Sequence, residues 1–345
     1  VWTRVAVQAV ANAAARIPIE ARERSTNEIF PDHLTVRLLR QANPFEAQAN
    51  LMRGIVSYRL LTGDAFLHLV RDKAGVPREL FLLNPELVEV QTDPKVRVRR
   101  YLYRHPDHEY TIDPQDMIHF REWHGRSGYR GLSKVETIAR SLAIDFNVQE
   151  WNAAFFSNYG VPSGIISPTD EDLGPKQLQD VVAALDAQTR GASKGHRTIA
   201  LPFGVRLDKT SVKPRDAEFI QQRKLIREEV AAMFGVPPLL MGDYEFANYA
   251  NSEQQLRVFW ENTILPVVAD ITDTLNEFLI PQIDPGVKLV FSLSDVTALV
   301  ESRNETTLRL NTLLQTGTVT RNEAREILGM AKSSDPIADE LIVPV

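Results

Sequence analysis

The 345-residue sequence contains no cysteine. Disulfide frameworks, thiolate zinc sites, iron–sulfur clusters and a cysteine nucleophile are therefore excluded, and a reducing compartment is permitted without being required. Long apolar runs are also missing. The longest uncharged stretch, residues 151–169, contains Ser, Asn, Gly and Pro throughout. No membrane-spanning helix is predicted from it, and no secretory signal is visible.

Positive charge is not in excess, because 39 Lys and Arg face 45 Asp and Glu and the net charge is −6. Proteins that coat nucleic acid nonspecifically neutralise phosphates with surplus Lys and Arg, so the composition argues against that class. Apolar residues make up 43% of the chain, which is enough for a sizeable core and excludes wholesale disorder. The length favours two domains or one elongated subunit with several parts.

Known catalytic motifs are absent. The sequence has no Gly-x-x-x-x-Gly-Lys-Ser/Thr loop, no Gly-x-Ser-x-Gly and no His-Glu-x-x-His. A glycine cluster precedes Ser133 and could bind phosphate, but Ser133 caps the same amides and favours a plain strand-to-helix connection. The pairs His119/His124 and His105/His108 lack a third ligand and are interpreted as ordinary strand and loop histidines. We therefore predict no enzyme activity, no cofactor and no metal.

The first 121 residues have the pattern of a mostly antiparallel α+β unit. Residues 1–16 favour a helix, residues 17–23 alternate like a strand, and a second helix over 46–61 is closed by Gly63. A hairpin turn is predicted at residues 72–75. From residue 65 onward the apolar positions follow a period of two, which predicts strands around 66–69, 80–83, 87–91, 96–103, 109–112 and 117–120.

A helix and a small insert are predicted next. Ser133 and Glu136 have the spacing of a capping box, and an apolar helical face continues from there to about residue 159. The acids at 170–172 could hold a divalent cation, but they more simply complement the dipole of the helix that follows. At about 50 residues the insert is marginal for a core of its own and needs neighbours. Its expected elements are strands at 165–166, 198–201 and 205–207 and an amphipathic helix at 178–185.

Two further helices flank a polar and aromatic loop. The helix over 217–234 stops at Gly235 because the two prolines that follow cannot continue it. The loop spans residues 241–250, and a long amphipathic helix begins near Asn251. Pro266 lies inside this helix, removes a backbone donor and predicts a kink.

The C-terminal part is predicted to contain a strand over 287–293 and two more helices. The last helix begins with the capping box Thr320–Glu323 and stops at Gly329. Residues 333–345 combine Ser, Pro and acids without a period and are interpreted as a tail.

Two groups of side chains are candidates for contact with a partner. The first is basic and lies in or around the insert: Lys176, Arg190, Lys194, His196 and Arg197. A solvated face is the simpler interpretation, and contact with nucleic acid or a partner is the alternative. The second group consists of the loop aromatics Tyr244, Phe246 and Tyr249. They either contact a partner or pack on their own helices, and the sequence favours neither.

The order of these segments resembles the portal proteins of tailed bacteriophages and gene-transfer agents, in the compact form of long-tailed phages. The most specific phrase is Phe-Gly-Val-Pro-Pro-Leu-Leu-Met-Gly at 234–242. Each of these short motifs alone is weak evidence for the resemblance, but their occurrence in the same order over residues 5–330 is specific. The other matching phrases are Asn43-Pro44, 61–66, 71–75, Leu83-Asn84-Pro85, 116–120, Gly131-Leu132-Ser133, 251–254, Leu265-Pro266 and 317–325.

This resemblance implies an α+β portal-type subunit with an α/β wing, two stem helices, a small α/β clip, a long kinked helix and a short helical crown. The parts implied are a wing at 1–132 to which 251–296 return, stem helices at 133–160 and 215–235, a clip at 161–214, a tunnel loop at 236–250, the long helix at 251–282, a crown at 297–330 and a tail at 331–345. The chain lacks the extended C-terminal barrel helix of longer portals.

Residue roles follow from the same resemblance. The tunnel loop would line a DNA channel, with acids that discourage tight phosphate binding, and the basic group of the insert would contact partners at the clip. The helix kink falls at Pro266. The channel-loop residues are Asp243, Tyr244, Glu245, Phe246, Asn248 and Tyr249.

The implied function is a ring, expected to hold twelve subunits, at one capsid vertex through which double-stranded DNA is packaged and ejected. The implied partners are the terminase large subunit, a head–tail adaptor, the major capsid protein and scaffold, with no membrane. The implied location is the portal vertex of the virion, after assembly in the host cytoplasm. Two alternatives are an enzyme, disfavoured by the missing motifs, and another ring-forming head–tail adaptor. Adaptors are usually much smaller, and the stem–clip–stem–loop order argues against one.

Overall fold

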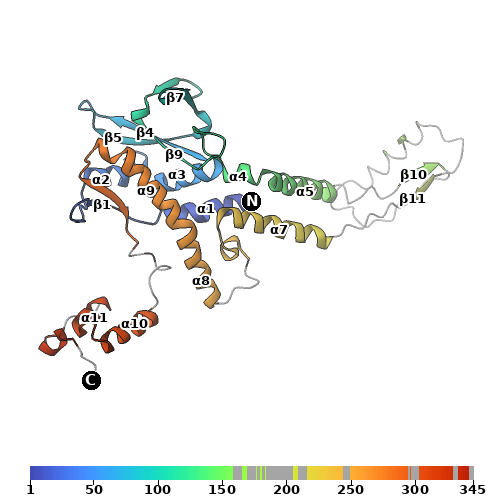
Figure 1. Cartoon of the computed structure of the whole chain (residues 1–345). Helices are drawn as coiled ribbons and strands as arrows, with labels where there is room; N and C mark the ends of the chain where they lie inside the picture. The colour runs from blue at the N-terminus through green and yellow to red at the C-terminus, as the bar shows by residue number, and fades with distance from the viewer. Residues whose placement is uncertain are drawn as a thin grey trace.

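Figure 1 shows the computed structural model, in which a helix pair extends from a body of helices and sheets. The structure describes residues 1–157, 165–168, 205–208, 216–243, 249–293, 303–328 and 333–341, and the single residues 176, 179, 180, 183 and 296. Its α-helices are α1 (Trp2–Ala14), α2 (Leu34–Arg40), α3 (Gln48–Thr62), α4 (Lys134–Thr137), α5 (Ala139–Ser157), α7 (Asp216–Phe234), α8 (Tyr249–Phe259), α9 (Leu265–Phe278), α10 (Arg303–Gln315) and α11 (Arg321–Ile327). Its strands are β1 (Ile19–Glu23), β2 (Gln41–Asn43), β3 (Glu46–Ala47), β4 (Asp64–Arg71), β5 (Pro77–Leu83), β6 (Val88–Asp93), β7 (Arg97–Arg104), β8 (Glu109–Ile112), β9 (Met117–Arg121), β10 (Ile165–Pro168), β11 (Val205–Asp208) and β12 (Val287–Phe291).

The core is built around α1, which lies between α3 and α7. The buried face of α1 consists largely of small side chains, and these let the neighbouring helices approach closely. Larger residues fill the rest of the same cluster, and each contributes about 1.5–3 kcal/mol by leaving water. The buried α1 residues are Ala6, Val7, Val10, Ala11 and Ala14, and they share the cluster with Leu51, Ile55, Phe234, Ile271 and Leu289, among others.

Two three-stranded antiparallel sheets follow α3 and confirm the predicted antiparallel α+β unit. Their strand orders are β5-β4-β9 and β6-β7-β8. Phe66 on β4 lies opposite Leu83 on β5 and His119 on β9. Phe66 also belongs to a second buried cluster with Val88 and Tyr101, which joins the two sheets. The predicted hairpin turn after β4 is present, with Gly75 at a φ of 81°.

Strands β1 and β12 pair with each other and so connect the N-terminal part of the chain to the segment after α9. Ile19 lies opposite Phe291 in antiparallel register, and Glu23 lies opposite Val287. The two strands were each predicted, but their pairing joins segments far apart in the sequence. It brings the segment after α9 back to the N-terminal part of the chain.

One helix of the body was not predicted. Helix α2 begins after His33, whose ring nitrogen accepts a hydrogen bond from the amide of Thr35 at 3.3 Å. Because histidine replaces the usual Ser, Thr, Asp or Asn at the cap, the sequence carries no start signal there. Elsewhere in the described part of the chain the helix bounds agree with the sequence to within a few residues, except that the first predicted long helix breaks at Ile138 into α4 and α5. The helix predicted at 178–185 is described only at residues 179, 180 and 183, and the strand predicted at 198–201 lies outside the described residues.

The long helix before β12 is interrupted near Pro266. A π-helical turn, Trp260–Ile264, separates α8 from α9, and Pro266 lies in the first turn of α9. At this position the missing proline N–H leaves no hydrogen bond of α9 unmade. The hydrogen bond that the proline cannot donate is missing from the preceding turn, Trp260–Ile264. The wider π-helical spacing of that turn leaves room for the pyrrolidine ring of Pro266.

The last helices form a small unit, and the predicted capping box at its second helix is confirmed. Thr320 accepts from the amide of Glu323, whose carboxylate accepts from the amide of Thr320. Residues 333–341, which the sequence pattern assigns to a tail, are instead ordered against this unit. Buried Asn322 on α11 donates to Asp339 at 2.8 Å and accepts from the Ser333 amide at 2.8 Å. Residues 333–341 therefore pack on α11, where Ser333 and Asp339 supply the hydrogen-bond partners that the buried Asn322 amide requires.

Candidate functional site

The most conspicuous functional feature is the helix pair formed by α5 and α7, which run side by side away from the body (Figure 1). At the far end of this arm β10 pairs antiparallel with β11, with Ile165 opposite Asp208. Between the helices the buried Asp145 carboxylate lies 3.7 Å from Arg223 Nε, and Gln149 donates to the same carboxylate at 2.6 Å. The Gln149 bond lies within α5, whereas the contact with Arg223 joins α5 to α7.

The base of the arm is fixed by the carboxylate of Asp64 at the start of β4. The Asp64 side chain is 1% exposed. Its Oδ1 accepts from the amide of Gly131 at 2.8 Å and from His119 Nε2 at 2.7 Å. The guanidinium of Arg130 lies 2.9 Å from Oδ2. A buried carboxylate is tolerated because a positive charge and two donors compensate it.

Gly63 and Gly131 make the closest backbone approach at this junction. A Cβ atom added to Gly131 would lie 1.9 Å from the Gly63 carbonyl oxygen, so no larger residue fits. That carbonyl also accepts from the Glu122 amide at 2.8 Å. Ser133 then caps α4 and donates its hydroxyl proton to the Leu61 carbonyl at 2.6 Å. The phrases at 61–66 and 131–133, separate in the sequence, thus meet in one joint.

Burial decides the protonation of His119 in this joint. It lowers the pKa of His119, and the hydrogen bond to the Asp64 carboxylate offsets this only in part. The ring is therefore neutral near pH 7 and donates its Nε2 proton to Asp64. His119 is an ordinary structural histidine, as the sequence favoured, and the glycine cluster is a strand-to-helix connection. In the part of the chain that the structure describes, no group of three His, Asp or Glu side chains could hold a metal ion.

A second ionic contact joins the same region to α9. Arg59 on α3 is 4% exposed, and its Nη2 lies 2.8 Å from Glu122 and 2.9 Å from Asp270. One guanidinium therefore links α3, the end of β9 and α9. Lys134 follows Ser133 and lies 6.0 Å from the centre of the Phe234 ring, at the end of α7. Both helices of the arm are thus anchored to the body at their base.

The segment after α7 is held firmly up to Asp243. Gly235 has a φ of 67°, which permits the sharp stop of α7, and its carbonyl accepts from Thr263 Oγ1 at 2.7 Å. The Asp243 amide donates to the Pro238 carbonyl at 2.9 Å. Its carboxylate accepts from Arg227 on α7. The guanidinium of Arg227 also lies 5.6 Å from the centre of the Trp2 ring on α1.

The predicted site residues are only partly within the described chain. Asp243 is placed as above, and Tyr249 is the first residue of α8. Lys176 is described as exposed and helical. The remaining members of both groups lie outside the described residues: Tyr244, Glu245, Phe246, Asn248, Arg190, Lys194, His196 and Arg197.

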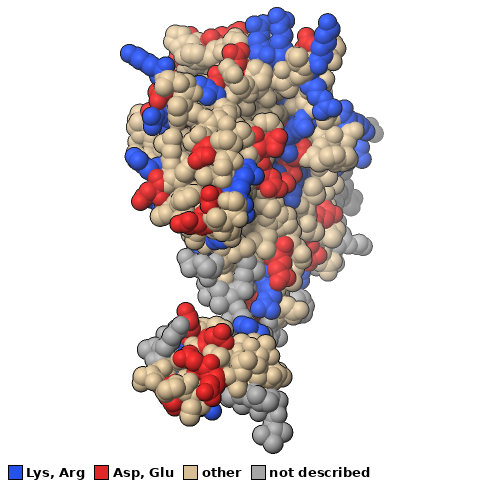
Figure 2. Space-filling model, turned by 60° about the vertical axis from the view of Figure 1, so that its left-hand side comes forward, with Lys and Arg blue, Asp and Glu red and all other residues tan. Residues whose placement is uncertain are grey.

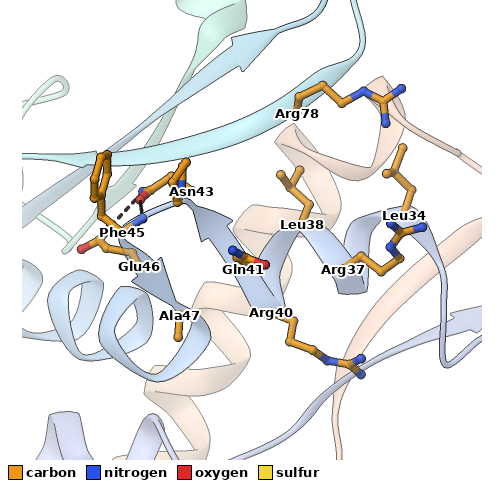
Figure 3. Close-up of a pocket in the computed structure, with 11 residues that line it drawn as sticks. Leu34, Arg37, Leu38, Arg40, Gln41, Asn43, Phe45, Glu46, Ala47 and Arg78 are labelled. Carbon is orange, nitrogen blue, oxygen red and sulfur yellow. Dashed lines mark hydrogen bonds between the residues drawn. The ribbon is translucent and has the colours of Figure 1, made fainter.

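The Asn43-Pro44 phrase forms a rigid turn beside a hollow of about 730 Å³ (Figure 3). Asn43 is 4% exposed, donates to the Leu80 carbonyl at 2.8 Å and accepts from the Phe45 amide at 2.9 Å. Phe45 at the tip of the turn is 86% exposed. A large aromatic side chain presented on a fixed turn is suited to contact with another molecule.

Comparison with known proteins accounts for these features together. The family model described as phage portal protein matches residues 2–329. The chain belongs to the phage portal protein family. The portal protein of Enterobacteria phage HK97 is 27% identical over 294 residues, which are 83% of this chain and 68% of that protein. An uncharacterised protein of Rickettsia bellii is 27% identical over 338 residues, with 95% and 86% of the two chains covered.

Chains in solved structures of gene-transfer-agent necks and of a phage portal protein have the same fold. A chain in the neck of a native gene-transfer-agent particle, computed with C12 symmetry, has a TM-score of 0.69 and 26% identity over 95% of this chain and 89% of its own. The neck of the empty particle, computed with C6 symmetry, gives 0.71 and 26% over 95% and 90%. An HK97-family portal from Corynebacterium diphtheriae has a TM-score of 0.63 at 18% identity, over 87% of this chain and 95% of its own, and supports the fold alone. The predicted portal-type α+β fold is confirmed.

Charged side chains of both signs lie on the surface of the body. In the view of Figure 2, Lys and Arg are interspersed with Asp and Glu over the body, and no broad region carries a single sign. Among the described residues, no helix is both long and apolar enough to cross a lipid bilayer.

Proposed function

We propose that this chain forms the ring-shaped portal at one vertex of a phage-like particle, through which double-stranded DNA enters and leaves. The single observation that carries the proposal is the arm of α5 and α7, which projects from a body of portal fold and ends in β10 and β11. The C12 symmetry of the related gene-transfer-agent neck supports a ring of twelve copies, about 470 kDa for a 38.9 kDa chain.

In this proposal the arm is the stem and its far end is the clip. The clip docks the terminase large subunit during packaging and the head–tail adaptor afterwards, with Lys176, Arg190, Lys194, His196 and Arg197 as candidate contacts. The body with its return strand β12 is the wing, which faces the capsid protein and scaffold and exposes Phe45 on a fixed turn. Rings assemble in the host cytoplasm and become the portal vertex of the virion. The subunit acts by shape and binding, without catalysis.

The tunnel loop is assigned to residues 236–250. Its N-terminal root, up to Asp243, is clamped to α7 and α1 through Arg227 and Trp2. A fixed root would let twelve loops hold equivalent positions around the channel axis. Tyr244, Phe246 and Tyr249 would touch DNA by van der Waals contact, while Glu245 would discourage tight binding of phosphate. A subunit with a net charge of −6 suits a channel in which DNA has to slide.

A packaging assay with loop variants tests this assignment. Replacing Tyr244 and Phe246 with alanine should leave rings intact and reduce packaged or retained DNA. The matched control is Trp123→Ala, which removes an exposed aromatic that is assigned to no contact. Unchanged packaging in the loop double variant, with rings intact, would contradict the loop assignment.

A charge-reversal variant tests the clip assignment separately. Replacing Lys176, Arg190 and Lys194 with glutamate should spare ring formation and weaken terminase or adaptor binding in pull-downs. Binding of terminase or adaptor to the native chain should weaken as the salt concentration rises, because salt screens exposed charge pairs. Equal binding by the variant and the native chain would overturn the role of these residues.

A further inference from the structure

A cavity of about 510 Å³ lies in the body between β7, β9 and the C-terminal end of α9, away from the arm and the loop root. A cavity of this size can hold a small organic ligand. The lining residues on which the argument rests are Arg97, Tyr101, His119, Arg121, Tyr129 and Phe278.

Two arginines line this cavity, and no Asp or Glu is among its described lining residues. Arg97 has no ion-pair partner in the described chain. Its register neighbour Asp93 is engaged elsewhere, because the carboxylate accepts from the amide of Lys95 at 2.8 Å. Arg121 donates to the carbonyl of Gly128 and has no carboxylate partner among the described residues. Both arginines are solvent-exposed, and neither has a carboxylate partner among the described residues, so both charges are accessible to an anion.

Tyr101 adds a neutral donor at a fixed position. It is 5% exposed, and its ring packs edge-on against Phe66 and His119 at centroid distances of 5.8 and 6.0 Å. Burial raises the pKa of Tyr101 to about 12, so the hydroxyl keeps its proton and can donate. No described residue accepts a hydrogen bond from this hydroxyl. The bond from His119 to Asp64 holds one wall of the cavity in place.

Exposed apolar side chains line the cavity together with the two arginines. Phe278 at the end of α9 is 53% exposed, and Val96 at the start of the β7 hairpin is 65% exposed. A single phosphate would leave most of the volume and both apolar side chains unused. The combination fits an anionic group joined to an apolar or aromatic body, with the anion toward the arginines.

We propose that this cavity binds an oxyanion, a phosphate or a carboxylate, attached to an apolar body. Arg97 and Arg121 supply charge-assisted hydrogen bonds, and the Tyr101 hydroxyl donates a further one. The same chemistry is offered by a free phosphate ester and by an acidic side chain of an adjacent copy of this chain. The site is independent of the channel and of the proposed clip contacts.

Isothermal titration calorimetry of the full chain with phenyl phosphate tests the proposal. We expect saturable binding that is tighter than that of inorganic phosphate. Arg121→Gln should weaken binding at least tenfold. Tyr101→Phe, which removes one neutral hydrogen bond, should weaken it about fivefold. Arg97→Gln is the second charge variant, because the Arg97 side chain makes no hydrogen bond or ion pair with any described residue. The matched control is Arg99→Gln, which removes an exposed cation of the same strand outside the cavity.

Two titrations distinguish a free ligand from an adjacent copy of the chain as the source of the oxyanion. Phenyl phosphate is titrated into assembled rings and into subunits at a concentration at which mass photometry shows single chains. Binding to both indicates a free ligand, whereas binding to single subunits alone indicates that a neighbouring copy fills the cavity in the ring. No saturable binding to single subunits would overturn the proposal. Equal weakening by Arg99→Gln and Arg97→Gln would also overturn it, because the effect would then be general charge attraction.

Discussion

The joint at the base of the arm and the arm itself are stabilised in different ways. In the joint, the Asp64 carboxylate is buried and contacts His119, Arg130 and the Gly131 amide. Along the arm, large apolar side chains face solvent in the single chain: Phe146 on α5 is 63% exposed and Leu225 on α7 is 55% exposed. The contacts of the joint lie within one subunit, whereas the arm exposes apolar side chains that another molecule could cover.

This difference matches the proposed function. In the proposed ring every subunit carries its stem at the same angle, and the buried contacts of the joint would hold that angle. The stems then have to pack against their neighbours, and exposed apolar side chains on both helices suit that contact. We therefore expect changes in the joint to unfold the subunit and changes in the arm to spare the subunit and weaken the ring.

The largest expected effect follows from replacing Gly131. Gly131→Val places side-chain atoms against the Gly63 carbonyl, which lies 1.9 Å from the position of a Cβ atom. We expect a loss of more than about 5 kcal/mol in the free energy of unfolding, measured by chemical denaturation, because the clash is with backbone atoms. Gly128→Val is the matched control, since nothing lies within 4 Å of a Cβ atom there. Equal stability of the two variants would show that the close approach is not required.

The next effect concerns the buried carboxylate. Asp64→Ala leaves the Arg130 charge and the Gly131 amide without their partner, and we expect a loss of about 3–5 kcal/mol. The comparison is Glu89→Ala, which breaks a surface ion pair with Arg104 at 2.6 Å. That pair is solvent-exposed on both sides, so its loss should cost less than about 1 kcal/mol. Similar losses in the two variants would remove the distinction between joint and surface.

A smaller effect on the subunit, but a clear one on the ring, is expected in the arm. Replacing Phe146 and Leu225 with serine should change the unfolding free energy of single subunits by less than about 0.5 kcal/mol, because both side chains are exposed. The fraction of rings counted by mass photometry should fall. Asn147→Ser, beside Phe146, should leave that fraction unchanged. A full yield of rings from the double variant would show that these side chains are not in the interface.

The smallest effect is a dependence on pH through His119. Burial lowers the pKa of His119 in the folded chain, so the unfolded chain binds the proton more readily. The stability from neutral His119 is thus complete above the unfolded pKa of about 6.5 and is lost as the pH falls below it. His119→Gln keeps a donor for Asp64 but does not titrate. Denaturation at pH 7.5 and pH 5 should show a steeper loss for the native chain, and parallel losses would refute the assignment.

Features with a local cause could be predicted from the sequence. Gly63 closes α3 at a φ of 83°, and Thr320 caps α11 together with Glu323, because both signals lie within one helical turn of the helix end. The strands of the two sheets followed from their period of two. The break at Ile138 within the first long helix has no comparable signal in its neighbours.

The joint could not be predicted, because its contacts join residues distant in sequence. Ser133 donates to Leu61 and Gly131 to Asp64, across 72 and 67 positions. Each phrase by itself indicates only a turn or a cap. Asp64 follows a glycine in an ordinary strand pattern, and nothing in that pattern marks its carboxylate as buried. The cavity between β7, β9 and α9 was missed for the same reason, since its arginines lie on different strands.

Cryo-electron microscopy of the purified full chain tests whether it forms the proposed portal ring. We expect closed rings of about 470 kDa for twelve copies, with α5 and α7 packed against the neighbouring stems and residues 244–248 around the central axis. Rings of a neighbouring subunit number with the same arrangement would agree with this expectation. Single chains at high protein concentration and physiological salt, or rings whose loops after Asp243 point away from the axis, would contradict it.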